Sequence, residues 1–343
     1  MPYSTPKILL IYTGGTIGMV KDSETGALKA FNFKKLLQNI PELKLLECKI
    51  ETISFTEPID SSNMNVQNWQ QIAEIIEDNY EEFDGFVVLH GSDTMSYSAS
   101  ALSFMLENLS KPVIFTGSQL PIGDLRTDAK ENLITAIQIA ALQEKGKPII
   151  KEVGLYFEYK LYRGNRTTKI SAEHFNAFAS PNFPELAESG VHLKINKELL
   201  LQTSKAKKIK VNKNFEENVI ILKLFPGINH NILTAVLAIP NLKGIILETY
   251  GSGNASTEAW FINELKKAIK QNIYVINVTQ CSGGSVAMGK YETSTDLKKI
   301  GVLSGHNITT EAAITKLMYL LGQKVSPKVF KTVFETSLRG EMY

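Results

Sequence analysis

The sequence predicts an α/β protein in which a doubly wound parallel sheet domain is followed by a smaller α/β domain. Short apolar runs alternate with segments of helical periodicity, which is the pattern of a parallel sheet with crossover helices. The chain has 343 residues, too many for one typical hydrophobic core. We therefore expect an N-terminal domain at residues 1–190, a linker at 191–218 that is rich in lysine and asparagine, and a C-terminal domain at 219–343.

The N-terminal part contains five short apolar runs, rich in β-branched residues, that are typical of buried strands. They are Lys7–Thr13, Ile50–Phe55, Phe86–His90, Val113–Thr116 and Val153–Phe157. Stripes of apolar residues with a period near 3.6 predict helices around 66–76, 102–109 and 133–141. Asp128 precedes the third helix and is expected to cap its first turn.

The C-terminal part repeats the alternation on a smaller scale. Strands are expected at Val219–Leu224, Gly244–Thr249 and Tyr274–Val278, and helices near 230–238, 258–270 and 310–321. Together these segments predict a second α/β domain.

Composition narrows the classes of function. The formal net charge is only +2, so the sequence does not predict a nucleic-acid or membrane partner. Two cysteines far apart in the sequence and five scattered histidines give no metal-ligand spacing and no disulfide framework. The Gly14-Gly15 loop fits neither a dinucleotide fingerprint nor a Walker loop. We expect a cytoplasmic protein without a metal or cofactor.

Polar residues collect in the loops that follow the five predicted strands, where ligands of open parallel sheets bind. Hydroxyl groups dominate these loops, which suits a small polar substrate and an activated hydroxyl nucleophile. The loops are Thr13-Gly14-Gly15-Thr16-Ile17-Gly18, Asp60-Ser61-Ser62-Asn63, Gly91-Ser92-Asp93-Thr94, Gly117-Ser118-Gln119 and Arg163-Gly164-Asn165-Arg166-Thr167-Thr168-Lys169.

Each of these features also has a plain structural interpretation. A Gly-Gly pair often only punctuates the end of a strand, Asp93 is placed as a helix cap would be, and a lone lysine such as Lys169 usually lies on the surface. His90, at the end of its strand, is interpreted as a core histidine with satisfied hydrogen bonds. The catalytic interpretation of Lys169 requires that it be buried beside Asp93.

The first and third loops together resemble the two defining motifs of the L-asparaginases, and the similarity extends over nearly the whole chain. It includes Phe178-Ala179-Ser180-Pro181-Asn182 and Tyr250-Gly251-Ser252-Gly253-Asn254. The Arg-Gly-Asn-Arg-Thr-Thr-Lys stretch at 163–169 is most similar to the intracellular, type I branch. The resemblance implies an asparaginase-like fold and hydrolysis of L-asparagine to L-aspartate and ammonia through a covalent acyl-threonine intermediate.

The resemblance also implies roles for individual residues. Thr16 matches the nucleophile, and Ser92, Asp93 and Lys169 match a second catalytic group near the scissile amide. The substrate-binding positions lie in the second and third loops. They are Ser61, Ser62, Gly91, Ser92 and Asp93. Asn254 matches a residue that reaches the site of a neighbouring subunit, which implies a homo-oligomer, either a dimer or a tetramer.

Two departures from the family pattern affect the mechanism. Ser92 replaces the usual threonine and keeps its hydroxyl. The stretch 21–28 lacks the tyrosine that is thought to activate the nucleophile in many members. Tyr291, in a polar glycine-bearing loop, is our candidate replacement. Packing is its alternative role, and Lys21, Glu24, a backbone group or a water molecule are the alternatives for activation.

Two other functions are compatible with this core. One is an amidase subunit that acts on a misacylated tRNA, and the other is a non-catalytic amino-acid-binding module. Near-neutral charge disfavours the first, and the absent tyrosine favours the second. Release of ammonia from free asparagine distinguishes them from an asparaginase. The polar segment 19–27, with Gly18 and Gly26 at its ends, is expected to form a lid that excludes water.

Overall fold

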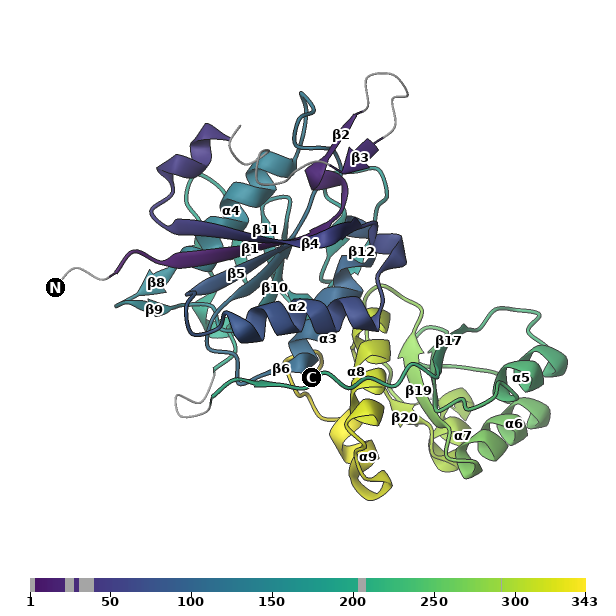
Figure 1. The fold of residues 1–343 in the computed structure, drawn as a ribbon. Helices are drawn as coiled ribbons and strands as arrows, with labels where there is room; N and C mark the ends of the chain where they lie inside the picture. The colour runs from purple at the N-terminus through teal and green to yellow at the C-terminus, as the bar shows by residue number, and fades with distance from the viewer. Residues whose placement is uncertain (1–3, 22–27, 31–39, 203–207, 291) are drawn as a thin grey trace. The chain divides into compact units, whose positions relative to one another are not determined.

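The computed structural model describes residues 4–21, 28–30, 40–202, 208–290 and 292–343 (Figure 1). The chain forms two compact units. The first comprises residues 1–180 and 184–213, and the second comprises residues 181–183 and 214–343. No described helix has the length and apolar character that crossing a bilayer requires.

The first unit is built on a mixed sheet of eight strands. Five of them are adjacent and run parallel to one another. The parallel strands are, in spatial order, β4 (Lys49–Ile59), β1 (Lys7–Gly14), β5 (Gly85–Leu89), β7 (Val113–Thr116) and β10 (Val153–Phe157). β5, β7 and β10 are buried throughout, as expected for strands that are covered on both faces. The predicted fold class is confirmed.

Helices cover both faces of this sheet. α2 (Val66–Asp78) and α3 (Met95–Met105) lie on one face and α4 (Ala129–Ala141) on the other (Figure 1). α2 begins with a capping box, in which the backbone and side chains of Asn65 and Asn68 bond reciprocally at 3.0 and 3.1 Å. This box satisfies two N–H groups that the first turn would leave unpaired.

The predicted capping role of Asp128 is wrong. Asp128 precedes α4 but already has helical backbone angles, and its side chain makes no capping bond. Thr127 Oγ1 instead accepts a bond from Ala129 N at 3.0 Å. The Asp128 carboxylate turns toward the loop after β7 and accepts bonds from Gln119 N at 2.9 Å and Leu120 N at 3.1 Å.

Antiparallel strands extend the sheet beyond β10. They are β11 (Lys160–Arg163), β14 (Ala187–Glu188) and β15 (Lys194–Ile195). A separate two-stranded ribbon joins β12 (Thr168–Lys169) to β13 (Phe178–Ala179). Another ribbon pairs β16 (Lys210–Val211) with β6 (Leu106–Glu107).

The remaining short strands of the first unit also form two antiparallel ribbons. One joins β2 (Met19–Lys21) to β3 (Leu28–Ala30), and the other joins β8 (Gln143–Glu144) to β9 (Lys147–Pro148).

The second unit has a parallel sheet of four strands with helices on both faces. The strands are β17 (Val219–Lys223), β18 (Gly244–Thr249), β19 (Tyr274–Thr279) and β20 (Leu303–Ser304). The helices α5 (His230–Leu237), α6 (Ala259–Lys270) and α7 (Glu292–Ile300) lie on one side of it, and α8 (Thr310–Gly322) and α9 (Pro327–Phe334) lie on the other (Figure 1).

A fully buried ion pair joins α8 to the C-terminal segment of the second unit. Lys316 Nζ on α8 lies 2.5 Å from Glu341 Oε1, and neither side chain is exposed. Lys316 also donates to the carbonyls of Phe334 and Thr336, and Glu341 accepts from the amides of Leu338 and Arg339. Burial lowers the pKa of Lys316, although the Glu341 carboxylate opposes that shift. These bonds compensate for the desolvation of both charges.

Candidate active site

The loops that follow β1, β4 and β5 are in direct contact with one another. Gly15 N donates to Ile59 O at 3.2 Å, which joins the first loop to the end of β4. Thr94 Oγ1 donates to Ser61 O at 2.7 Å, which joins the third loop to the second. Because β4, β1 and β5 are neighbouring parallel strands, their carboxyl ends bring these loops to one edge of the sheet.

Thr16 begins a short 3-10 turn, Thr16–Gly18, immediately after β1. The turn follows Gly15, whose φ of 84° is a backbone conformation that glycine favours. Within the turn, Ile17 is fully buried and Thr16 is half-buried. The Tyr12 ring packs against Gly18, because a Cβ placed there would lie 2.2 Å from the Tyr12 hydroxyl. The nucleophile candidate therefore lies on a close-packed turn.

The two serines of the second loop differ in exposure. Ser61 is buried, and a Cβ on Gly91 would lie 2.5 Å from its hydroxyl oxygen. Ser62 is exposed, and its hydroxyl donates to Asp60 Oδ1 at 2.9 Å. Asp60 Oδ1 also accepts from Ser62 N at 2.9 Å, and so fixes this turn.

Ser92, Asp93 and Lys169 form a hydrogen-bonded cluster although 76 residues separate Lys169 from Asp93. Lys169 Nζ lies 2.8 Å from Ser92 Oγ and 2.6 Å from Asp93 Oδ1. The Lys169 side chain is 18% exposed and that of Asp93 is 63% exposed. Lys169 is thus a largely covered lysine that engages a hydroxyl and a carboxylate, rather than a solvated surface charge.

The antiparallel ribbon of β12 and β13 positions Lys169. Lys169 is opposite Phe178 in the ribbon, and Ile170 N donates to Ala177 O at 2.7 Å just beyond it. The buried Phe178 ring packs on Phe157 with a centroid distance of 5.0 Å. This packing anchors the ribbon to the strand β10 of the main sheet.

His90 is completely buried and its ring bonds to the backbone of the third loop. Its Nδ1 lies 2.7 Å from Gly91 O, and its Nε2 lies 2.8 Å from Ser98 Oγ. A carbonyl only accepts, so Nδ1 carries the proton and Nε2 accepts from Ser98. Burial lowers the pKa of His90 to about 4, which keeps the ring neutral. The interpretation of His90 as a core histidine is confirmed.

One further residue, Gln119, contacts the cluster and was given no role from the sequence. Ser92 Oγ donates to Gln119 Oε1 at 3.1 Å, and Gln119 Nε2 donates to His174 O at 3.1 Å. The residue lies in the loop after β7, which Asp128 fixes through backbone bonds. Its position directly after a strand end was the available signal.

The other candidate residues lie elsewhere in the chain. Asn254 belongs to the second unit, where its backbone bonds reciprocally with Tyr250 at 2.8 and 2.9 Å. Tyr291 and Glu24 lie outside the described residues, as does most of the expected lid.

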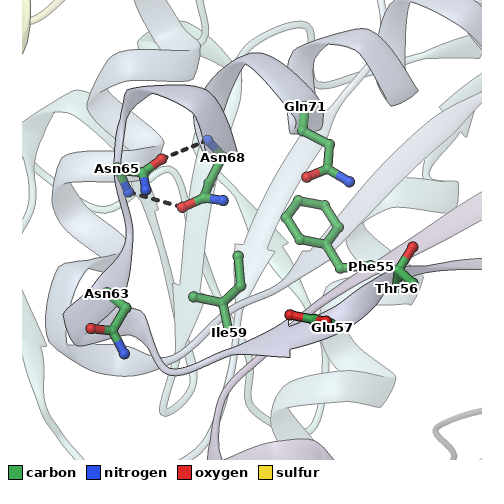
Figure 2. Close-up of a pocket in the computed structure, with 8 residues that line it drawn as sticks. All are labelled: Phe55, Thr56, Glu57, Ile59, Asn63, Asn65, Asn68 and Gln71. Carbon is green, nitrogen blue, oxygen red and sulfur yellow. Dashed lines mark hydrogen bonds between the residues drawn. The ribbon is translucent and has the colours of Figure 1, made fainter.

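A pocket next to the second loop contains none of the predicted catalytic side chains. Its volume is about 430 Å³, and Ile59 and Asn63, which flank Asp60–Ser62, are among the residues that line it (Figure 2). Phe55 and Gln71 close another part of it. Over the described ranges of the chain, no group of three or more histidine, cysteine, aspartate or glutamate side chains could hold a metal ion.

The chain is similar to known proteins over almost its whole length. Residues 7–201 match the family model described as Asparaginase, N-terminal, and residues 218–334 match the Glutaminase/Asparaginase C-terminal domain. L-asparaginase 1 of Escherichia coli (strain K12) is 42% identical, with 98% of this chain and 97% of that protein covered. The crystal structure of L-asparaginase I from Vibrio cholerae superposes with a TM-score of 0.90 at 40% identity, with 99% and 100% of the chains covered.

A protein from Mus musculus named 60 kDa lysophospholipase is 41% identical over 98% of this chain, and the match spans 62% of that longer protein. The two family models, the full-length identity and the shared fold agree with the glycine motifs around Thr16 and Ser92. The chain belongs to the L-asparaginase family, in its type I branch.

Proposed function

We propose that the protein is a cytoplasmic L-asparaginase that hydrolyses the side-chain amide of L-asparagine with Thr16 as the nucleophile. One observation supports this most strongly: Lys169 Nζ is bonded to both Ser92 Oγ and Asp93 Oδ1. The loop that carries Ser92 and Asp93 touches the Gly15–Thr16 turn through its backbone. A lysine held against a hydroxyl and a carboxylate beside a separate threonine is suited to proton transfer around an amide.

In the proposed reaction Thr16 Oγ1 attacks the amide carbon of the substrate side chain. Its proton passes to an activating group, for which Tyr291 is the candidate, and from there to the relay that Ser92, Asp93 and Lys169 form. The tetrahedral oxyanion requires backbone donors. Gly15 N already donates to Ile59 O, so the amides of Thr16 and Ser92 are assigned this role. The C–N bond then breaks, and the leaving nitrogen takes a proton and departs as ammonia. Water attacks the β-aspartyl ester, releases aspartate and restores the Thr16 hydroxyl.

The substrate's charged ends have complementary groups in the same loops. Asp93 is the candidate partner of the α-ammonium group, because its carboxylate is largely exposed next to Ser92. The Ser61–Ser62 turn, together with the backbone at Gly91, is assigned to the α-carboxylate. Ser62 is exposed, so its hydroxyl, which donates to Asp60 Oδ1, is also accessible to a ligand. Thr16, Ser92 and Lys169 then surround the amide.

Replacement of the nucleophile tests the function. Thr16→Ala should abolish ammonia release from asparagine, whereas Thr56→Ala, on an exposed part of β4, should release ammonia at the wild-type rate. Acid quenching of the wild-type reaction should trap an aspartyl group on the peptide that contains Thr16, detected by mass spectrometry. A Thr16→Ala enzyme within tenfold of wild type would overturn the assignment. Wild-type protein that binds asparagine without releasing ammonia would instead indicate a binding module.

The proposal includes a homo-oligomer in which Asn254 completes a neighbour's site. Oligomers made only of Thr16→Ala subunits should be inactive, and oligomers made only of Asn254→Ala subunits should be weakly active. Mixed oligomers contain one intact site composed of unmodified residues from two chains, and activity should reappear on co-expression. A fully active monomer in analytical ultracentrifugation would exclude this arrangement.

A further inference from the structure

The side-chain amide of Gln119 occupies one hydrogen-bonding direction of the Ser92 hydroxyl. Ser92 Oγ donates to Gln119 Oε1 at 3.1 Å and accepts from Lys169 Nζ at 2.8 Å. The same Gln119 amide donates from Nε2 to His174 O at 3.1 Å. A continuous chain of bonds therefore runs from Lys169 through Ser92 and Gln119 to the turn that follows β12.

The direction of this chain is fixed by His174. A backbone carbonyl can only accept, so the Gln119 amide must present Nε2 to His174 and Oε1 to Ser92. Ser92 has one proton, and Oε1 takes it. The Ser92 oxygen is then left to accept from Lys169, so the hydroxyl proton is aimed at an amide oxygen and away from the amine.

An amide oxygen is also the group that the proposed substrate would present at this position. The side chain of asparagine ends in the same carboxamide as the side chain of glutamine. Asp128 fixes the Gln119 backbone through bonds to the amides of Gln119 and Leu120. Displacement of the Gln119 carboxamide therefore requires only rotation of its side chain, because its backbone is held independently.

The geometry points to Gln119 as an internal carboxamide that occupies Ser92 in the free enzyme and must be displaced by the substrate amide. This inference rests on the proposed asparaginase function. Gln119 is then a specificity-determining residue: it opposes binding of ligands that cannot replace its bond to Ser92, and it is a positioning residue for the Ser92 proton. Once it is displaced, the hydroxyl is able to turn its proton toward the substrate, while its oxygen still accepts from Lys169.

The substitution Gln119→Met tests the inference, because it keeps the length of the side chain and removes both bonds. The KM for asparagine should fall about fivefold, the size expected for the net loss of one competing neutral hydrogen bond, while kcat changes by a smaller factor. The affinity for the product aspartate, measured by calorimetry, should rise by a similar factor. Gln67→Met, an exposed glutamine on α2, is the matched control and should alter neither value.

A second substitution gives the opposite expectation. Gln119→Glu supplies a stronger acceptor for Ser92 and a charge near Lys169, so KM should rise at neutral pH and recover as the pH is lowered and the carboxylate is protonated. An unchanged or raised KM in Gln119→Met, with a proportional fall in kcat, would overturn the inference. Failure of the asparaginase function itself would appear separately, as absence of ammonia release by the wild-type protein.

Discussion

Gly15 and Gly91 touch through their backbones: a Cβ on Gly15 would lie 2.5 Å from Gly91 N and 2.6 Å from Gly91 Cα. The two residues follow β1 and β5, and they immediately precede the proposed nucleophile Thr16 and the proposed relay residue Ser92. The contact therefore packs the loop that carries the proposed nucleophile directly against the loop that carries Ser92. Any side chain at position 15 would separate the loops.

We predict that Gly15→Ala lowers kcat/KM at least 10²-fold, because displacement of the nucleophile by about 1 Å misaligns attack. The methyl group would collide with backbone atoms, and the φ of 84° is unfavourable for alanine. Gly123→Ala is the control, since a Cβ there has no atom within 4 Å. Steady-state ammonia assays compare the two variants. Equal activity of the Gly15 and Gly123 variants would show that the loops do not need this contact.

Lys169→Met should lower kcat about 10²-fold or more, since it removes the proposed proton-transfer group from Ser92 and Asp93. Lys197→Met provides a matched comparison, because Lys197 pairs with Glu144 at 2.9 Å but is 57% exposed. That surface pair should contribute little, and its variant should retain wild-type rates. Similar kinetics for the two lysine variants would identify Lys169 as a structural residue.

Tyr291→Phe tests the replacement for the missing tyrosine of the N-terminal loop. If the phenol accepts the Thr16 proton, its removal should lower kcat by about 10²-fold with a modest change in KM. Tyr159→Phe, at an exposed tyrosine of the first unit, is the control. A fully active Tyr291→Phe enzyme would direct attention to Lys21, Glu24, a backbone group or a bound water molecule.

The buried His90 should make stability depend on pH. Its pKa of about 4 in the folded protein is below the ordinary value of 6.5, so between these values the unfolded chain binds a proton that the folded chain does not. The stabilisation is fully present above about pH 6.5 and is lost as the pH falls to about 4, by ~3 kcal/mol. Urea unfolding between pH 7.5 and 4.5 measures the effect.

His90→Gln should be less stable than wild type at pH 7.5, because it disturbs the bonds to Gly91 and Ser98. Its free energy of unfolding should nevertheless fall less steeply with decreasing pH, since the titrating group is gone. Parallel pH dependences for the two proteins would contradict the assignment of this titration to His90.

The strands and helices that the sequence predicted are those with a strong periodic or continuous apolar pattern. β5, β7 and β10 lie within a residue of the expected bounds. The antiparallel strands β14 and β15 were missed because two residues carry no periodicity. α7 was missed because seven of the nine residues in its sequence ETSTDLKKI are polar or charged, which hides its apolar stripe.

The site was predicted in a different way. Strand-end positions indicated Thr16 and Ser92 by general rules, but Lys169 depended on the family resemblance, since no local pattern joins residues 76 apart. Gln119 received no role because its importance arises only from contact with Ser92 and His174. The role of Asp128 was misread because a cap residue and a loop-supporting residue have the same sequence context.

The buried pair of Lys316 and Glu341 constrains how this sequence can change over generations. Loss of either partner alone leaves an uncompensated charge in a dry interior, which typically costs 3–5 kcal/mol, whereas an apolar pair of similar volume is often as stable as the ions. A lineage that replaces the ionic pair by an apolar pair must therefore pass through an intermediate protein that folds poorly, or change both codons together. We expect the two positions to covary among descendants, so that each is ionic or apolar only when the other is.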